Sequence, residues 1–234
     1  MIKKYLLTVM LIFAVTAGAW AQEKPQAKKD TTRNYQFTVE SDAFLLAGQL
    51  INYGYANNSA SSLIEAAKIV KQYGFDKMDA SEMKKKNPTS EAPSNEGSDL
   101  HSMDVSKLLT DAKKLAAGDK TLIALAESVN KSTRATSPNG IQGERIWLGA
   151  NSSTTYMATR KKGELSVYSA VPEKSYCDID ICVYDDYEDE VICDTRSNSS
   201  ARVSWYCSRS QTYEVEISNE SDYGTYVTVS STRR

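Results

Sequence analysis

The sequence predicts an α+β protein in which a helical bundle precedes an antiparallel β-sandwich or jelly roll. Apolar residues recur with a helical period between residues 35 and 131. From residue 141 onward they alternate with polar residues in short segments rich in Val, Ile, Tyr and Thr. The stretch STRATSPNG between these regions is rich in turn-forming residues. We therefore predict a helical domain over residues 22–137 and a β-sandwich domain over residues 138–234.

The amino terminus has the features of a secretory signal peptide. Lys3 and Lys4 precede the apolar run YLLTVMLIFAVTAGA, and small residues flank Trp20 at a cleavage site that ends with Ala21. The apolar run is shorter than the ~20 residues that span a bilayer, which favours a cleaved signal over an uncleaved anchor. We expect a bacterial protein that is periplasmic or secreted, with residues 1–21 removed and no stable membrane anchor.

The helical region is predicted to form two related hairpins. The first contains ESDAFLLAGQLINYGYAN, which Ser41 can cap, and SASSLIEAAKIVKQYG, which ends at Gly74. The second contains DVSKLLTDAKKLAAG and DKTLIALAESVNK, and its TLIALAESV resembles SLIEAAKIV of the first. Two similar hairpins suggest a small bundle that serves as a scaffold, or alternatively a groove for a peptide partner.

The chain shows little sign of catalytic chemistry. Its single histidine, His101, lies in a polar segment at residues 84–102 that we predict to be a mobile loop without a fixed catalytic partner. No GxSxG, HExxH or phosphate-binding glycine loop occurs in the sequence. A pair of carboxylates could still act in a cryptic hydrolase, which is the least favoured interpretation. The formal net charge of −2 argues against nucleic acid as a partner.

The carboxyl-terminal region contains eight candidate strands. They are short, and turn-forming residues separate them, as in a sandwich of two antiparallel sheets. The candidates are ERIWLGA, TTYMATR, GELSVYSAV, YCDIDICVYD, EVICDT, ARVSWYC, TYEVEIS and GTYVTVS.

The order of motifs over residues 141–234 resembles the bacterial pre-peptidase C-terminal (PPC) domain family. The matching positions are Asp178-Ile179-Asp180, Tyr184-Asp185, Trp205, Tyr213, Asn219 and Tyr226. The resemblance implies a β-sandwich, usually non-catalytic, some of whose relatives bind calcium or extracellular polymers such as collagen. The sequence departs from the family at the turn near Tyr187, where acidic residues replace the usual glycine. The family name is no evidence of proteolysis.

An acidic hairpin is predicted over residues 178–194, DIDICVYDDYEDEVICD. A turn at residues 186–189 places Cys182 opposite Cys193 on the neighbouring strand. Directly opposed residues lie ~4.5–5.5 Å apart at Cα, which suits a disulfide. Alternation along the first strand directs its isoleucines and Val183 toward the core, and its other side chains away from it.

Four cysteines in an exported chain suggest two disulfides. Of the three possible connectivities, Cys182–Cys193 together with Cys177–Cys207 best fits the alternation of side chains along the strands. A redox pair or a zinc site is the alternative, but the chain has neither Cys-x-x-Cys nor a nearby histidine.

The carboxylates of the hairpin are candidate calcium ligands. No other cofactor is expected. The candidates are Asp178, Asp180, Asp185, Asp186 and Asp189. One ion cannot bind all of them, because at ~3.3 Å per residue the turn lies ~17 Å from the start of the strand. Calcium would use either the strand pair or the turn alone. The alternative is that the acids simply keep a hairpin edge soluble.

Two tyrosines of the same hairpin, Tyr184 and Tyr187, are candidates for a ligand-binding face, because tyrosine offers rigid amphipathic area. Cross-strand packing is the alternative role. Together these features predict a non-enzymatic exported binding protein whose partner is an extracellular or periplasmic polymer or protein. The alternative is a periplasmic scaffold whose helical domain docks a protein.

Overall fold

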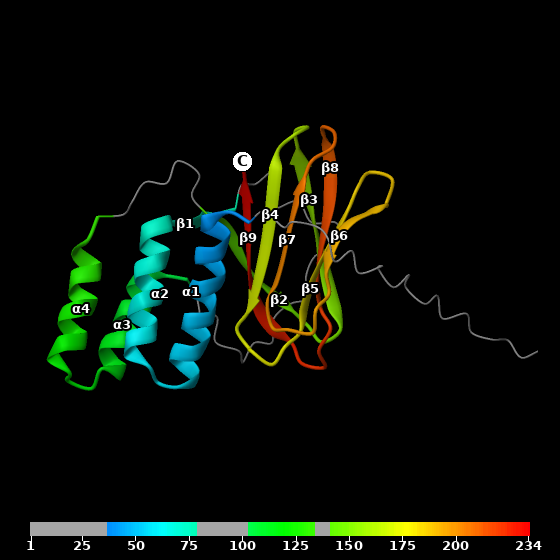
Figure 1. Cartoon of the computed structure of the whole chain (residues 1–234). Coiled ribbons are helices and arrows are strands. Elements are labelled where there is room, and N and C mark those ends of the chain that lie inside the picture. Colours follow the sequence, from blue (N-terminus) through cyan, green and yellow to red (C-terminus); the bar gives the residue numbers. More distant parts are fainter. Residues whose placement is uncertain (1–36, 79–102, 134–140) are drawn as a thin grey trace, which may run out of the picture. The chain divides into compact units, whose positions relative to one another are not determined.

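The computed structural model describes residues 37–78, 103–133 and 141–234 (Figure 1). Within these ranges the chain is an α+β protein with a β-sandwich, which confirms the predicted fold class. The helices are α1 (Val39–Ala56), α2 (Ala60–Tyr73), α3 (Val105–Leu115) and α4 (Lys120–Lys131). The strands are β1 (Phe75–Lys77), β2 (Ile141–Leu148), β3 (Ser152–Arg160), β4 (Leu165–Pro172), β5 (Ile179–Tyr184), β6 (Glu190–Asp194), β7 (Ala201–Tyr206), β8 (Gln211–Asn219) and β9 (Thr225–Arg233).

Several predicted features lie outside the described residues. These are the signal peptide at residues 1–21, the loop at 84–102 with His101, and the boundary between residues 137 and 138. All three stay predictions. Among the helices that the structure describes, none is long and apolar enough to cross a membrane.

The helix ends follow local capping rules, with one correction. Thr38 is the N-cap of α1, and its hydroxyl accepts a hydrogen bond of 3.1 Å from the Ser41 N–H. The prediction that Ser41 caps this helix was wrong, because Ser41 is buried and its hydroxyl bonds Ser169 of β4 instead. α2 ends as predicted at Gly74, whose φ of 74° suits glycine.

The strands form two sheets that face each other across a common core. The five-stranded sheet has the order β1-β2-β9-β4-β7, and the four-stranded sheet has the order β3-β8-β5-β6. Eight strands coincide with the predicted segments. The ninth, β1, has three residues and pairs in parallel with β2, so it is too short to show a period of its own.

Helix α1 packs against the outer face of the five-stranded sheet. A Cβ at Gly48 would lie 2.7 Å from Cγ1 of Val171, so only glycine allows this close approach. The Asn52 amide adds a hydrogen bond of 2.7 Å to the carbonyl oxygen of Pro172. Ile141 and Val171 of the sheet share a hydrophobic cluster with the helices, and the described residues belong to one compact unit.

Strand β8 defines the two ends of the sandwich. At one end Asn219 pairs with Ser152 and Ile179, and the loops β2–β3, β4–β5 and β8–β9 meet there (lower end in Figure 1). At the other end Gln211 pairs with Arg160, and the loops β3–β4, β5–β6 and β7–β8 meet (upper end in Figure 1). The acidic hairpin turn therefore lies at the upper end.

Candidate functional site

The acidic hairpin forms as predicted and is closed by a disulfide. Cys182 pairs with Cys193 across β5 and β6, and their Cα atoms lie 4.2 Å apart in the disulfide. The register shifts after Val183, so Tyr184 pairs with Glu190. This bulge is the one departure from the predicted pairing, and the predicted inward face of β5 is buried.

The predicted second bridge, Cys177–Cys207, is wrong, because both residues are buried thiols. Cys177 precedes Ile179, which pairs with Asn219 at the lower end. Cys207 follows β7 and donates its N–H to the carbonyl oxygen of Glu164 at the upper end. The nine-residue strand β8 separates these ends by about 26 Å at ~3.3 Å per residue. The alternation of side chains predicted that both cysteines face the core. It could not predict that they lie at opposite ends of the sandwich.

The carboxylates of the hairpin turn are occupied by hydrogen bonds and by an arginine. Asp185 Oδ1 accepts from the N–H groups of Tyr187 at 2.9 Å and Asp189 at 3.1 Å. The guanidinium of Arg209 lies 3.0 Å from Asp185 Oδ2 and 2.8 Å from Asp186 Oδ1. Desolvation raises the pKa of Asp185, but these hydrogen bonds outweigh it and hold the pKa below its usual range. The guanidinium of Arg209 thus contacts both of these turn carboxylates.

The two strand carboxylates lie away from this turn. Asp178 is at the lower end, where its Oδ1 accepts a hydrogen bond of 3.1 Å from the Asn198 N–H. Asp180 is a half-buried residue of β5. Across residues 37–78, 103–133 and 141–234, no group of three or more acidic, histidine or cysteine side chains is placed to hold a metal ion. Calcium binding stays a prediction with no preformed cluster behind it.

The predicted tyrosine face is divided between two environments. Tyr184 is half-buried, and burial, Glu216 and Glu190 raise its pKa. Tyr187 is 69% exposed in the turn, and its ring centroid lies 4.5 Å from the Arg209 guanidinium. Tyr187 is therefore held in the same arginine-centred turn, and the ligand role of both residues stays a prediction.

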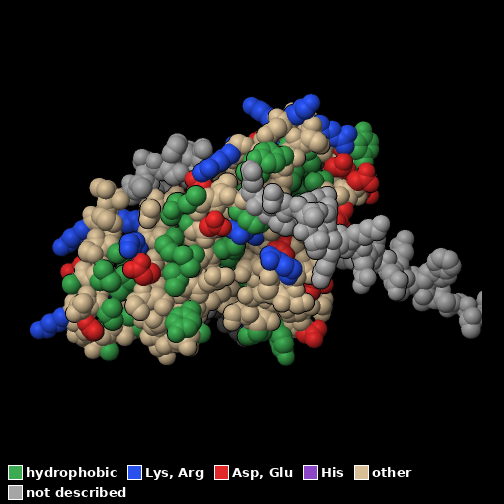
Figure 2. Space-filling model, in the orientation of Figure 1, with side chains coloured by type: hydrophobic (Ala, Val, Ile, Leu, Met, Phe, Trp, Pro, Cys, Tyr) green, Lys and Arg blue, Asp and Glu red, His purple; other side chains and the backbone are tan. Residues whose placement is uncertain are grey.

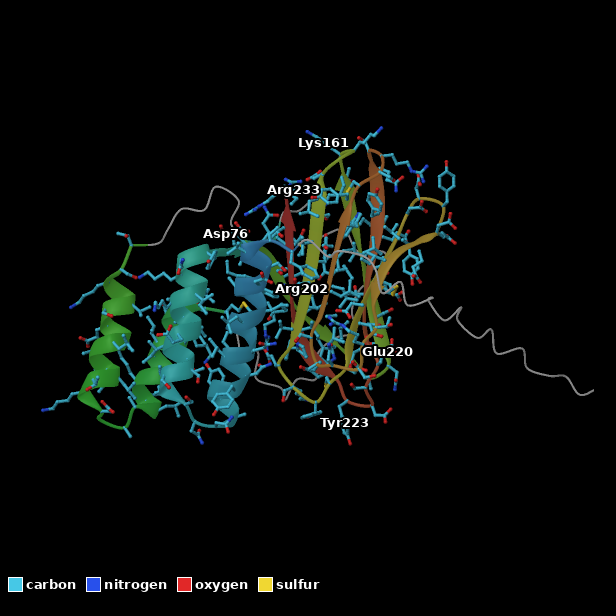
Figure 3. The ribbon with its side chains drawn as sticks, in the orientation of Figure 1. Asp76, Lys161, Arg202, Glu220, Tyr223 and Arg233 are labelled. Carbon is cyan, nitrogen blue, oxygen red and sulfur yellow. A yellow bond between two sulfur atoms is a disulfide. The ribbon has the colours of Figure 1, made fainter. Side chains whose placement is uncertain are left out.

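A second aromatic surface lies at the lower end, and the sequence did not reveal it. Tyr176 is 66% exposed and Tyr223 is 62% exposed, although they come from different loops. Their ring centroids lie 5.9 Å apart with an interplanar angle of 87°. Tyr223 projects outward from the end of the sandwich (Figure 3). We call Tyr176 and Tyr223, with the loops that hold them, the tyrosine end.

The buried side chain of Asn219 ties the loop of Tyr223 to the β2–β3 loop. Its Nδ2 donates to the carbonyl oxygens of Tyr223 at 2.8 Å and Gly149 at 2.9 Å, and its Oδ1 accepts from the Ser221 N–H at 3.2 Å. Asn219 has no exposed surface. The Asn219 amide thus connects loops β2–β3 and β8–β9, because both its nitrogen and its oxygen form hydrogen bonds to their backbone.

Further contacts hold the backbone next to both tyrosines in place. The ammonium of Lys174 donates to the carbonyl oxygen of Gly224 at 2.8 Å. A Cβ at Gly224 would lie 2.4 Å from the Trp147 ring, so the backbone after Tyr223 packs directly on that ring. The carbonyl oxygen of Lys174 accepts the Cys177 N–H at 2.9 Å, which closes a turn around Tyr176. The rings are therefore presented on fixed backbone.

Exposed polar side chains lie on the same loop as Tyr223 and on the neighbouring loop β2–β3. Asn151, Asp222 and Glu220 are exposed, and the Asn151 amide lies 3.2 Å from Asp222 Oδ1. Asn151 adopts a φ of 48°, which asparagine tolerates in turns, and its N–H bonds the carbonyl oxygen of Ser221 at 3.0 Å. In the space-filling view, hydrophobic and acidic side chains protrude together from this lower end (Figure 2).

The sequence pattern did not indicate the residues of the tyrosine end. Tyr184 and Tyr187 lie in a dense acidic motif, which made them the predicted ligand-binding tyrosines. Tyr223 instead lies within the turn-rich segment SDYG, and Tyr176 begins the predicted strand YCDIDICVYD but lies in the loop before β5. An aromatic residue inside a turn segment has few neighbours to bury it, and that signal could have identified Tyr223.

No protein-family model matches the chain, and no curated protein matches it. The resemblance to the PPC family therefore stays a prediction. Among solved structures, the chain is similar to PliG of Aeromonas hydrophila, a periplasmic lysozyme inhibitor of g-type lysozyme, with 6% identity and a TM-score of 0.34 over 41% of this chain and 88% of that one. It is also similar to Yersinia pseudotuberculosis-derived mitogen, with 10% identity and a TM-score of 0.32 over 40% and 86%. Similarities this low carry no function over.

Proposed function

We propose that the chain is an exported, non-catalytic binding protein that recognises a polymer outside the cytoplasm. The observation behind this proposal is the pair Tyr176 and Tyr223, two exposed rings on loops that hydrogen bonds to their backbone hold in place. Rigid loops on a stable scaffold are the usual position of binding residues. Tyrosine supplies contact area at a low cost in conformational entropy.

Export is supported by the Cys182–Cys193 disulfide, because such bonds form and persist in oxidising compartments. The basic and apolar pattern of residues 1–21 agrees with this compartment. Periplasmic and extracellular destinations satisfy both observations equally. The PPC resemblance adds the same expectation of a non-catalytic module on an exported protein.

Co-sedimentation with insoluble polymers tests the proposal. The chain beginning at Gln22 is mixed with peptidoglycan, cellulose, chitin or collagen, and the bound fraction is measured. We expect the wild type to sediment with at least one polymer, and Tyr176→Ala/Tyr223→Ala to lose that binding at least tenfold. The matched control is Tyr187→Ala/Tyr206→Ala, which removes two exposed tyrosines elsewhere. Equal binding by all three proteins, or binding to none of the polymers, would overturn the proposal.

A scaffold that docks a helical segment of a partner protein is the second candidate. Val39, Leu46 and Tyr53 are exposed on α1 at intervals of seven residues, which is the spacing of a coiled-coil seam. If this function is correct, Leu46→Glu will release a protein that co-purifies from periplasmic extract, and Gln49→Glu will retain it. Retention by both variants would exclude this use of α1.

A further inference from the structure

The tyrosine end has the chemistry to bind a sugar chain, an inference that rests on the proposed binding function. A pyranose ring has an apolar face of C–H groups and a rim of hydroxyls. An exposed aromatic ring complements the first, because it offers flat apolar area next to a polar edge. Tyr176 and Tyr223 lie nearly perpendicular, so together they offer ring surfaces in two directions.

The polar side chains beside the rings suit the hydroxyl rim. Asp222 and Glu220 offer pairs of acceptor oxygens, and the Asn151 amide offers both donors and an acceptor. Such planar groups can engage two neighbouring hydroxyls at once. Asn151 lies in loop β2–β3 and Asp222 in loop β8–β9. Because Asn219 bonds both loops, the distance between these two side chains is held in the same way as the Tyr223 loop.

The charge at this end selects neutral sugars over acidic ones. The exposed carboxylates of Asp222 and Glu220 lie at the surface, whereas the nearby ammonium of Lys174 is bonded to the Gly224 carbonyl oxygen. A uronic or sulfated chain would bring more negative charge against these carboxylates. Like charges at short range repel each other, which lowers the affinity for such a chain relative to a neutral one.

The shape of the surface favours a sugar chain over a peptide. Protein ligands are usually anchored by a side chain buried in a pocket. In the described part of the chain, two small hollows lie near α1, one between α1, α2 and β1 and the other between α1 and the Val171–Glu173 segment. Tyr176 and Tyr223 are instead exposed rings, on which an internal part of a linear chain can lie without a terminal residue entering a cavity.

We propose that the tyrosine end is a binding site for a neutral polysaccharide chain, with the rings of Tyr176 and Tyr223 as the stacking surface and Asn151 and Asp222 as hydroxyl partners. Ring stacking and hydroxyl contacts make separate demands. Tyr223→Phe keeps the ring and should retain most of the affinity. Tyr223→Ala removes the ring and should lose it.

Affinity gel electrophoresis provides the test. Native gels contain a neutral polysaccharide (β-glucan, xyloglucan, galactomannan or dextran), an anionic one (alginate or polygalacturonate), or gelatin. We expect retardation in at least one neutral gel and none in the anionic gels or in gelatin. Tyr176→Ala and Tyr223→Ala should each weaken that retardation at least tenfold, Asn151→Ala/Asp222→Ala several-fold, and Tyr206→Ala not at all. Thermal melting confirms that each variant is folded.

The outcomes separate the sugar proposal from the general binding function. Retardation by gelatin that is lost in Tyr176→Ala/Tyr223→Ala would refute the sugar ligand while supporting the binding site. Retardation in alginate or polygalacturonate would refute the neutral class. The absence of retardation in every gel, together with equal sedimentation of wild type and Tyr176→Ala/Tyr223→Ala, would overturn both proposals.

Discussion

Asn219 holds Tyr223 through a hydrogen bond of 2.8 Å from its buried amide to the tyrosine carbonyl oxygen. The ring of Tyr223 meets solvent, whereas the residue that positions its backbone has no exposed surface. Asn219 therefore positions the Tyr223 loop, whereas the Tyr223 ring is the part that can contact a ligand. Preorganisation of this kind reduces the entropy that binding must overcome.

Replacement of Asn219 by alanine should loosen the tyrosine end without removing either ring. The Asn219→Ala change leaves the Tyr223 and Gly149 carbonyl oxygens and the Ser221 N–H without their partner. We expect the free energy of unfolding to fall by about 1–3 kcal/mol, measured by urea denaturation. Asn198→Ala, at an exposed asparagine, is the control and should change it by less than about 0.5 kcal/mol. Equal stability of the two variants would show that Asn219 does not anchor these loops.

The single disulfide should account for a large part of the stability of the sandwich. Cys182→Ser/Cys193→Ser should lower the free energy of unfolding by about 3 kcal/mol, because the closed loop restricts the unfolded chain. Reductant should destabilise the wild type and leave this variant unchanged. A stability that reductant does not alter would contradict the assignment.

The two remaining cysteines give a separate check on connectivity. Cys177 and Cys207 are buried, and burial raises the pKa of the Cys207 thiol. Mass spectrometry should therefore find no alkylation of the native protein by iodoacetamide and two alkylated thiols after unfolding without reductant. The recovery of a disulfide-linked Cys177–Cys207 peptide would instead support the pairing predicted from the sequence.

The hairpin turn should depend on pH through Asp185. Its pKa is lower in the folded state than in the unfolded chain, where it is about 3.9. The contribution of Asp185 to stability is thus complete above that value and is lost as the pH falls through the lower folded pKa. The Tm difference between wild type and Asp185→Asn should be present at neutral pH and shrink toward pH 2. A difference that stays constant over this range would exclude a role for the carboxylate charge.

Calcium should have little effect on this turn, because the Arg209 guanidinium already contacts Asp185 and Asp186. We expect the Tm to be unchanged when millimolar calcium replaces a chelator. In Arg209→Ala the carboxylates lose that partner, and we expect a small calcium-dependent rise in the Tm. A clear rise in the wild type would instead support the calcium site predicted from the sequence.

The two ends of the sandwich show what a single sequence can and cannot predict. The register of Cys182 and Cys193 follows from local alternation and one turn, so it was predictable. The positions of Cys177 and Cys207 depend on how the strands cross between two sheets, which alternation does not encode. The tyrosine end presents the same difficulty. Tyr176 and Tyr223 are far apart in sequence and meet only because β5 pairs with β8.

The most direct test of the tyrosine end is a comparison of dissociation constants on one polymer that retains the wild type. The three proteins are the wild type, Tyr176→Ala/Tyr223→Ala and Tyr187→Ala/Tyr206→Ala, all confirmed as folded by thermal melting. We predict at least a tenfold weaker affinity for the first variant, equivalent to about 1.4 kcal/mol, and an unchanged affinity for the second. Equal affinity in all three, or a loss confined to Tyr187→Ala/Tyr206→Ala, would contradict the assignment of the binding surface to the tyrosine end.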